Sequence, residues 1–237
     1  MTRAAELLGL GDRELVALVG GGGKSTLLFR LGDELAAAGK RVVLTTTTKM
    51  GRYQISDLDN VCWSSDTQCA EAALSKPGPV MLLTDGDDHK VTGPPPEVVD
   101  QLYASSTADY IVVEADGSHG RPLKAPAAHE PVVPRAATTV VIMVGIDAVG
   151  QRVDRAVHRV EVAYRFAGLD KGHLLTTEDC SEILSHPDGA LRVCPRTSRV
   201  IVAVTKASSE TDRASAAAIA RQLENHPRIA ACVLLDG

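Results

Sequence analysis

Aromatic side chains are scarce in this chain: Phe, Trp and Tyr make up 3% of its 237 residues. Because 44% of the residues are hydrophobic, the interior must be built mainly from Val, Leu, Ile and Ala. The net charge of −5, with acids and bases mixed along the chain, gives no support to non-specific nucleic-acid binding, which needs a basic face. This length suits one large α/β domain or two small ones.

Paired cysteines and long apolar runs are also missing. The five cysteines form no C-x-x-C pair, which argues against a zinc knuckle, an iron–sulfur site or a disulfide framework. Near the N-terminus Glu6, Asp12 and Arg13 interrupt any signal-peptide core. No apolar run approaches the ~20 residues that a membrane span needs. We therefore expect a soluble, cytoplasmic protein without membrane or nucleic-acid partners.

Short apolar runs alternate with helical patterns along the chain. Expected strands cover residues 15–19, 41–46, 80–84, 110–114, 139–144, 199–204 and 231–235, and expected helices cover 24–38, 66–75, 96–105, 177–185 and 211–225. Strands that are apolar on both faces belong to a sheet covered by helices on both sides. The pattern predicts an α/β fold with a doubly wound, mostly parallel sheet, a Rossmann-like three-layer sandwich of the P-loop NTPase type. We expect a single domain over residues 1–237, and a subdomain change near residue 136 is compatible with it.

A glycine-rich loop follows the first expected strand and precedes the first expected helix. It consists of Gly20, Gly21, Gly22, Gly23, Lys24, Ser25 and Thr26. Glycines let backbone N–H groups wrap an anion, and the following helix presents its positive N-terminus to the same anion. Lys24 can then reach the β- and γ-phosphates of a nucleotide, while the Ser25 hydroxyl can ligate Mg²⁺. The loop predicts a nucleotide site.

The usual phosphate-loop pattern, G-x-x-x-x-G-K-[ST], fits imperfectly, because its first glycine would fall at Leu18. A shorter G-x-x-G-K-[ST] form, of the kind that Mur-type ligases use, fits from Gly20 to Ser25. A flexible glycine turn with a solvated lysine is the simpler alternative. A dinucleotide fold is disfavoured, because G-x-G-x-x-G needs a glycine at Ser25 and an acid after the second strand.

Acids end the apolar strand over residues 110–114. Glu114 closes the strand and Asp116 lies on the same side by strand periodicity. A carboxylate there can hold Mg²⁺ directly or through water, although a turn or helix-capping acid remains an alternative. At the end of the second expected strand, residues 45–48 are four threonines. One of their hydroxyls can ligate Mg²⁺ or orient water, unless they are ordinary β-branched strand residues.

A basic, proline-containing loop follows these acids. Arg121 or Lys124 can neutralise charge on a transferred phosphoryl group, and His119 or His129 can handle a proton. A solvated loop whose charges have no role is the alternative.

Two further segments carry candidate binding residues. Asp147 and Arg159 can touch a second substrate, although turn chemistry also explains the glycines around Asp147. A guanine reader would place N-K-x-D at residues 205–208, where this chain has Thr205 and Ser208 at the Asn and Asp positions. Guanine selection by that route is unsupported, and ATP is the favoured nucleotide.

These motifs together resemble the YqeC family, which is associated with accessory functions for selenium-dependent molybdenum hydroxylases. The resemblance covers essentially the whole chain and rests on LVGGGGKSTLLFRL, LTTTTKM, VVEADGSHGRPLKAPAAHEPVVP, VGIDAVG and VHRVE. It implies nucleotide phosphate at residues 20–26 and a metal near Glu114 and Asp116. The chain departs from the family pattern at two places. Members often have an N-K-x-D-like segment where this chain has residues 205–208, and they often have proline where it has Val160.

Our leading hypothesis is a Mg²⁺-dependent NTPase or phosphotransferase that serves maturation of selenium-dependent molybdenum hydroxylases or their cofactor. In this hypothesis Lys24 binds the phosphates, and Ser25 and Glu114 bind the metal, with Asp116 beside them. Arg121 or Lys124 neutralises the negative charge on the transferred phosphoryl group. The second hypothesis is a nucleotide-gated chaperone for a cofactor or target enzyme. The third is a small-molecule kinase or ligase.

Overall fold

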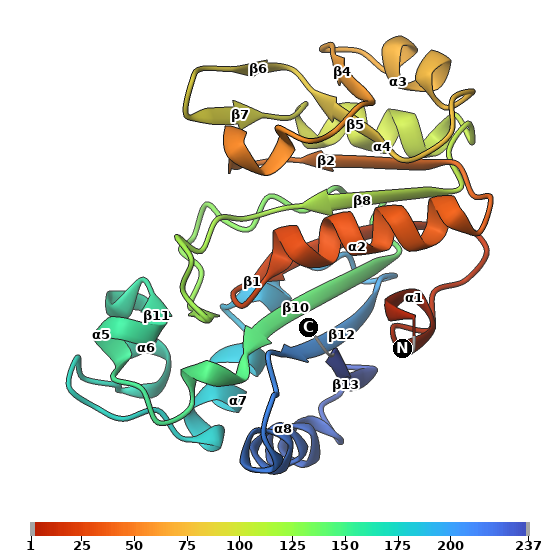
Figure 1. Ribbon diagram of the computed structural model, residues 1–237. Coiled ribbons are helices and arrows are strands. Elements are labelled where there is room, and N and C mark those ends of the chain that lie inside the picture. The colour runs from red at the N-terminus through yellow and green to blue at the C-terminus, as the bar shows by residue number, and fades with distance from the viewer. Residues whose placement is uncertain (1–2, 236–237) are drawn as a thin grey trace. The chain divides into compact units, whose positions relative to one another are not determined.

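The computed structural model describes residues 3–235 of the chain. Figure 1 shows its helices and strands. By backbone contacts the chain divides into two compact units. Unit 1 comprises Met1–Leu18, Ser25–Gly117 and Val132–Thr139, and unit 2 comprises Val19–Lys24, Ser118–Pro131 and Val140–Gly237. The single domain expected from the sequence stays a prediction.

Unit 1 holds one run of parallel strands. Its strands lie in the order β1-β8-β2-β5-β4, and every pairing in this run is parallel. The bounds are β1 (Glu14–Gly20, whose last two residues belong to unit 2), β2 (Val42–Thr46), β4 (Val61–Trp63), β5 (Val80–Leu83) and β8 (Tyr110–Glu114). Parallel pairing places the carboxyl ends of β1, β2 and β8 at one edge, where ligands bind in sheets of this kind.

The other elements of unit 1 are helices and a small antiparallel sheet. The helices are α1 (Ala4–Leu7), α2 (Lys24–Ala37), α3 (Gln68–Ala73) and α4 (Pro96–Ala104), with a 3₁₀ turn at Arg52–Ile55. The small sheet has the order β3-β7-β6, from β3 (Lys49–Gly51), β6 (Asp85–Gly86) and β7 (Lys90–Thr92). The single tryptophan, Trp63 on β4, is 45% exposed, with the Arg52 guanidinium 5.3 Å from its ring centre.

Unit 2 continues the strand order from the end of β1 through β10 (Thr139–Gly145) and β12 (Arg199–Thr205) to β13 (Ala231–Leu235). The β12–β13 pairing is parallel. A second, two-residue pairing joins β9 (Leu123–Lys124) to β11 (Val157–His158). The helices are α5 (Val153–Ala156), α6 (Val160–Ala167), α7 (Thr177–Ser185) and α8 (Glu210–Leu223), with 3₁₀ turns at Ile146–Ala148 and Ala190–Val193.

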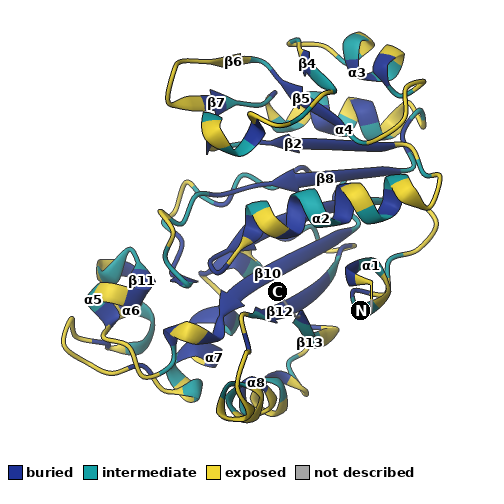
Figure 2. Ribbon diagram, in the orientation of Figure 1, coloured by how far each residue is buried: buried dark blue, intermediate teal, exposed yellow. Residues whose placement is uncertain are grey.

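Both units bury aliphatic side chains, as the scarcity of aromatics requires. In α2 the apolar stripe is buried, with Leu28 and Leu31 fully inaccessible and Leu27 and Leu35 at most 5% exposed. Strands β2, β8 and β10 are buried over their whole lengths (Figure 2). Each fully buried Val, Leu or Ile contributes about 1.5–3 kcal/mol relative to exposure. In the part of the chain that the structure describes, no helix has the length and apolarity that crossing a bilayer demands.

The predicted fold class is confirmed: the chain forms an eight-stranded, mostly parallel α/β sheet with helices. All seven expected strands and all five expected helices are present, with ends shifted by at most two residues. The elements not expected are short, such as β9 and β11, or lie in the segment between residues 146 and 176. A two-residue strand cannot show an alternating pattern, so the sequence carries no periodic signal for it.

Candidate functional site

The glycine loop leaves β1 and turns directly into α2. Gly20, Gly22 and Gly23 have φ values of 94°, 74° and 101°, in the left-handed region that favours glycine. Backbone bonds fix the turn within unit 2, because the Gly21 N–H donates to the Met143 carbonyl over 2.9 Å. The loop therefore has one defined shape.

Close packing is a second reason for glycine at position 22. A Cβ atom there would lie 2.1 Å from the Gly145 nitrogen and 2.7 Å from its Cα, far inside contact distance. At Gly23 a Cβ would meet nothing within 4 Å, so that glycine is needed for its backbone angle alone. The loop is held against the end of β10 on one side and is open at Gly23.

Lys24 begins α2 and is only 4% exposed. Its Nζ donates to the Gly20 carbonyl over 2.5 Å, so the side chain folds back over the loop that precedes it. A buried ammonium group requires acceptors around it. An arriving phosphate offers charged oxygens, which accept stronger hydrogen bonds than a carbonyl does.

Unit 1 brings Ser25 and Glu114 together. The Ser25 hydroxyl donates to Glu114 Oε2 over 2.7 Å, and Glu114 is 7% exposed at the end of β8. Neighbouring ligands of an octahedral Mg²⁺ lie about 2.9 Å apart, since each lies ~2.1 Å from the metal. The two oxygens are therefore spaced as two ligands of one Mg²⁺ are.

The chemistry of these donors also fits Mg²⁺. Among the described residues no group of three or more His, Cys, Asp or Glu side chains is placed to hold a metal ion. Mg²⁺ usually takes one or two protein oxygens and fills its shell with water and substrate phosphate. A hydroxyl and a carboxylate are thus sufficient protein ligands for this ion.

The threonines at the end of β2 and directly after it donate to backbone carbonyls. Thr46 Oγ1 donates to the Glu114 carbonyl over 2.9 Å, and Thr45 Oγ1 donates to the Leu82 carbonyl over 2.7 Å. Thr47 Oγ1 donates to the Val132 carbonyl over 2.6 Å. Three of the four hydroxyls considered for metal or water are therefore engaged with carbonyl groups, and one of them braces the strand end that carries Glu114.

Asp116, the second predicted metal acid, is 2% exposed and lies just beyond the end of β8. The backbone before it is fixed, since the Ala115 N–H donates to the Leu18 carbonyl and the Ala115 carbonyl accepts from the Val132 N–H, each over 2.9 Å. The Asp116 backbone is thus held beside the end of β1 in unit 1.

The basic loop forms its own network in unit 2. Arg121 Nη1 donates to the Asp154 carbonyl over 2.8 Å and to the Arg155 carbonyl. The buried Lys124 ammonium pairs with Glu130, whose other oxygen pairs with Arg159. Burial pushes the pKa of Glu130 upward, but hydrogen bonds and charge from Lys124 and Arg159 outweigh burial and lower that pKa. Glu130 is therefore ionised and links the loop to Arg159, the residue before α6.

Two histidines lie beside this network. The rings of His119 and His158 stack with centroids 4.8 Å apart and planes 19° from parallel. Burial first, and then the positive charges of Lys124, His119 and Arg159, lower the pKa of His158 to about 4. His158 is consequently neutral at pH 7, and the stack does not bring two positive charges together.

Thr205 and Asp147 have partners that the motif comparison did not suggest. Thr205 Oγ1 donates to the Gly22 carbonyl over 2.5 Å, so this residue supports the glycine loop from the end of β12. Asp147 pairs with Lys206 over 2.7 Å, with both side chains about half exposed. Sequence reasoning missed the support from Thr205, because only the fold brings residue 205 to residue 22.

The structure thus groups the predicted residues into two sets. Ser25 and Glu114 meet in unit 1, while Lys124, Arg159 and the unpredicted Glu130 meet in unit 2. The only sequence signal for Glu130 was that it is an acid in the basic loop. That signal does not show which basic residue Glu130 pairs with.

Comparisons with known proteins give one clear family match. A family model described as "YqeC protein" matches residues 16–161. The chain is 32% identical over 214 residues to "Uncharacterized protein YqeC" of Escherichia coli (strain K12), which covers 90% of this chain and 83% of that protein.

Solved structures give a weaker similarity. The signal recognition particle receptor FtsY from Elizabethkingia anophelis aligns with a TM-score of 0.42 and 15% identity, over 98% of this chain and 63% of that one. Chloroplast FtsY from Physcomitrella patens aligns with a TM-score of 0.32 and 13% identity, over 91% of this chain and 48% of that one. The chain spans less than two thirds of either structure, and these alignments carry no functional argument.

Proposed function

This chain belongs to the YqeC family, and from the residues around its glycine loop we propose that it binds a nucleoside triphosphate together with Mg²⁺. One observation carries the proposal: the Ser25 hydroxyl lies 2.7 Å from the Glu114 carboxylate, directly after a buried lysine at a helix start. Lysine, hydroxyl and strand-end acid are the three side chains that a phosphate loop uses.

Each residue has a specific task in this proposal. Backbone N–H groups of the loop and the start of α2 bind the phosphate oxygens. Lys24 exchanges its bond with the Gly20 carbonyl for the β- and γ-phosphates. Ser25 and Glu114 hold Mg²⁺, with Asp116 as the further acid near them. When bound, this ion would neutralise phosphate charge.

We further propose that the protein hydrolyses the nucleotide or transfers its phosphoryl group. Arg121 is the first residue proposed to stabilise the developing charge, because its guanidinium donates to the neutral carbonyls of Asp154 and Arg155. Lys124 is the second, although its pairing with Glu130 suits it better to positioning the loop. The role in maturation of selenium-dependent molybdenum hydroxylases, with a maturation protein or cofactor as partner, rests on the family resemblance alone.

Nucleotide titration with Mg²⁺ tests the central claim. We expect Lys24→Ala to weaken binding of ATP, GTP or CTP at least about tenfold, because it removes charge-assisted bonds to phosphate. Lys171→Ala, which removes an exposed lysine on a loop of unit 2, is the matched control and should bind as the wild type does. Equal affinity of Lys24→Ala and wild type would remove the phosphate-loop assignment. Comparing the three nucleotides tests the ATP preference.

Turnover assays separate the enzyme from its alternatives. Steady phosphate release by the protein alone supports an NTPase. Slow hydrolysis that rises only when a partner protein is added supports the nucleotide-gated chaperone. Phosphate transfer to a small acid supports the kinase or ligase.

A further inference from the structure

Two strands of unit 2 end beside the glycine loop, and a charged residue follows each of them. Asp147 follows β10, and Lys206 follows β12, which is the neighbour of β10 in the sheet. Lys206 Nζ donates to Asp147 Oδ2 over 2.7 Å, and both side chains are about half exposed. The proposed function gives this ion pair no task.

The carboxylate of Asp147 lies next to the glycine loop itself. A Cβ atom on Gly145 would lie 2.2 Å from Asp147 Oδ1 and 3.4 Å from the Gly22 Cα. Both atoms are therefore close to one point, and a molecule bound at the loop can reach the carboxylate. From β12, Thr205 Oγ1 donates to the Gly22 carbonyl over 2.5 Å, which fixes the residue before Lys206 to the same glycine.

Lys206 has a backbone conformation that its ion pair does not explain. Its φ is 65°, in the left-handed region that is unfavourable for a residue with a Cβ atom. An exposed ion pair contributes little to stability, so the pair with Asp147 does not offset this cost. Backbone strain of this kind concentrates at functional sites. The strain therefore points to a binding role for this pair rather than a role in folding.

One oxygen of the Asp147 carboxylate is available to a ligand. In the part of the chain that the structure describes, the side chain of Asp147 accepts one hydrogen bond, from Lys206 to Oδ2, and Oδ1 has no donor. A carboxylate alone would repel a phosphate bound nearby, but the Lys206 ammonium neutralises its charge. The pair therefore suits a neutral group that carries hydrogen-bond donors.

We propose that Asp147 binds the ribose of the nucleotide and accepts hydrogen bonds from its 2′- and 3′-hydroxyls. These hydroxyls are neutral donors on adjacent carbons, and the two oxygens of one carboxylate can accept from both. An acid holds ribose by the same chemistry in dinucleotide-binding folds. Lys206 is a positioning residue, because it holds Oδ2 and thereby orients the carboxylate. This inference rests on the proposed nucleotide site at the glycine loop.

The place of Asp147 favours contact with the sugar over contact with the base. In a nucleotide the ribose is bonded directly to the phosphates, whereas the base lies beyond the ribose. A carboxylate beside Gly22 of the phosphate loop is therefore nearer to the sugar. Ribose is also common to ATP, GTP and CTP, so this contact does not depend on which base the protein prefers.

Nucleotides that lack the two hydroxyls test this contact. In calorimetric titrations with Mg²⁺, the wild type should bind ATP at least about tenfold more tightly than 2′,3′-dideoxy-ATP, because the dideoxy form makes no hydrogen bonds to the charged carboxylate. Asp147→Ala should bind the two nucleotides equally. The same comparison of GTP with 2′,3′-dideoxy-GTP shows whether the contact is independent of the base.

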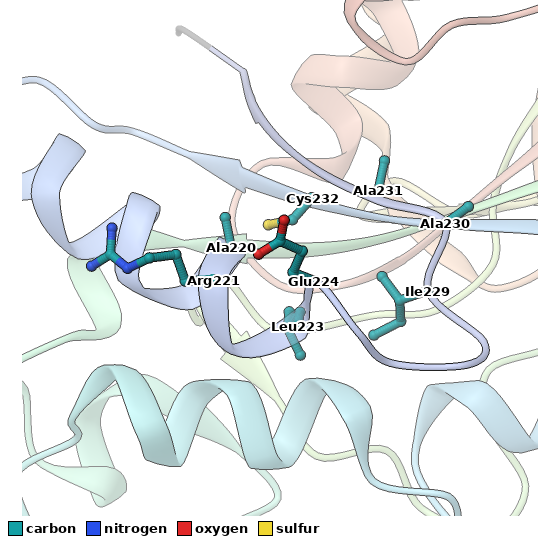
Figure 3. Close-up of a pocket in the computed structure, with 8 residues that line it drawn as sticks. All are labelled: Ala220, Arg221, Leu223, Glu224, Ile229, Ala230, Ala231 and Cys232. Atoms are coloured by element: carbon teal, nitrogen blue, oxygen red, sulfur yellow. The ribbon is translucent and has the colours of Figure 1, made fainter.

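Glu224→Ala is the matched control. Glu224 is an exposed carboxylate of unit 2 that lines a groove of about 310 Å³ between α8 and β13, beside Ala231 (Figure 3). Ala231 pairs with Ile201 near the start of β12, whereas Lys206 follows the end of that strand. Glu224 thus lies away from the glycine loop, and its removal should keep the wild-type ratio of the two affinities.

Variants of Lys206 test its positioning role. Lys206→Met removes the ammonium and should lower the ratio of the two affinities, because the carboxylate is no longer held in place. Lys206→Arg keeps a cation that can pair with Asp147 and should restore the ratio. Urea unfolding of both variants should stay close to that of the wild type, because an exposed ion pair contributes little stability.

Two results would overturn the ribose contact and leave the nucleotide site intact. One is a wild type that binds ATP and its dideoxy form equally, while Lys24→Ala weakens binding of both. The other is an Asp147→Ala variant that keeps the wild-type ratio, including one that changes the preference between ATP and GTP instead, which would assign the carboxylate to the base. A wild type that binds no triphosphate would overturn both this inference and the proposed function.

Discussion

Replacing Gly22 with alanine tests whether the glycine loop is packed as tightly as the structure shows. The added Cβ would lie 2.1 Å from the Gly145 nitrogen, so the two backbone segments must move apart. Gly39, after α2, is the matched control. Its φ of 78° nearly equals the 74° of Gly22, but a Cβ there meets nothing within 4 Å.

The comparison separates backbone strain from crowding. Alanine in the left-handed region costs about 1–2 kcal/mol at either position. Crowding adds about 1–3 kcal/mol at Gly22 only, the range for forcing extra atoms into a packed region. We therefore expect Gly39→Ala to lose about 1–2 kcal/mol of unfolding free energy and Gly22→Ala about 2–5 kcal/mol.

Urea unfolding of the two variants beside wild type measures this difference. Thermal melting offers a second measurement, since 1 kcal/mol corresponds to about 2–4 °C in a chain of this size. Because the displaced loop is also the proposed phosphate site, Gly22→Ala should lose nucleotide affinity while Gly39→Ala keeps it. Equal destabilisation by both variants would show that Gly22 and Gly145 are not in contact.

Further predictions concern the groups around the loop. Thr205→Val should lose about 1 kcal/mol in urea unfolding, because the Gly22 carbonyl loses its hydroxyl donor, and unchanged stability would contradict that bond. Glu130→Gln should cost about 3–5 kcal/mol by the same measurement, because it breaks the buried ion pair between Glu130 and Lys124; a loss below ~1 kcal/mol would be typical of an exposed ion pair. His158 has a pKa of about 4 when folded against 6.5 as its ordinary value, so the unfolded chain binds the proton more tightly. Stability should thus be full above pH 6.5 and fall as the pH drops toward 4, and His158→Gln should reduce that slope; an unchanged slope would exclude His158 as its source.

Helices with a clear apolar stripe and strands with a continuous apolar run were predictable from the sequence. The stripe of Leu27, Leu28, Leu31 and Leu35 defines α2, and continuous runs of Val and Ile define β8, β10 and β12. The helix α6 was not expected, although Gly168 ends it in the left-handed conformation that often terminates helices. Its residues, VEVAYRFA, are eight in number, fewer than a reliable helical period requires.

Within the site, residues that belong to local sequence motifs were predictable, whereas contacts between distant segments were not. Lys24 and Ser25 belong to one local motif, and Glu114 was predicted as a strand-end acid whose neighbour is a phosphate loop. The bond from Thr205 to Gly22 and the contact of Gly22 with Gly145 join segments more than a hundred residues apart. Such contacts depend on how strands are ordered in the sheet, which alternation of apolar and polar residues does not specify.

Tryptophan fluorescence can distinguish the two units, because Trp63 lies in only one of them. It is the one tryptophan of the chain, and its place on β4 belongs to unit 1. Its emission therefore reports on the surroundings of β4, whereas the far-ultraviolet circular dichroism signal comes from the helices and strands of both units. A denaturant titration followed by both signals would show coincident transitions if the units unfold as one, and separated transitions if each unfolds alone.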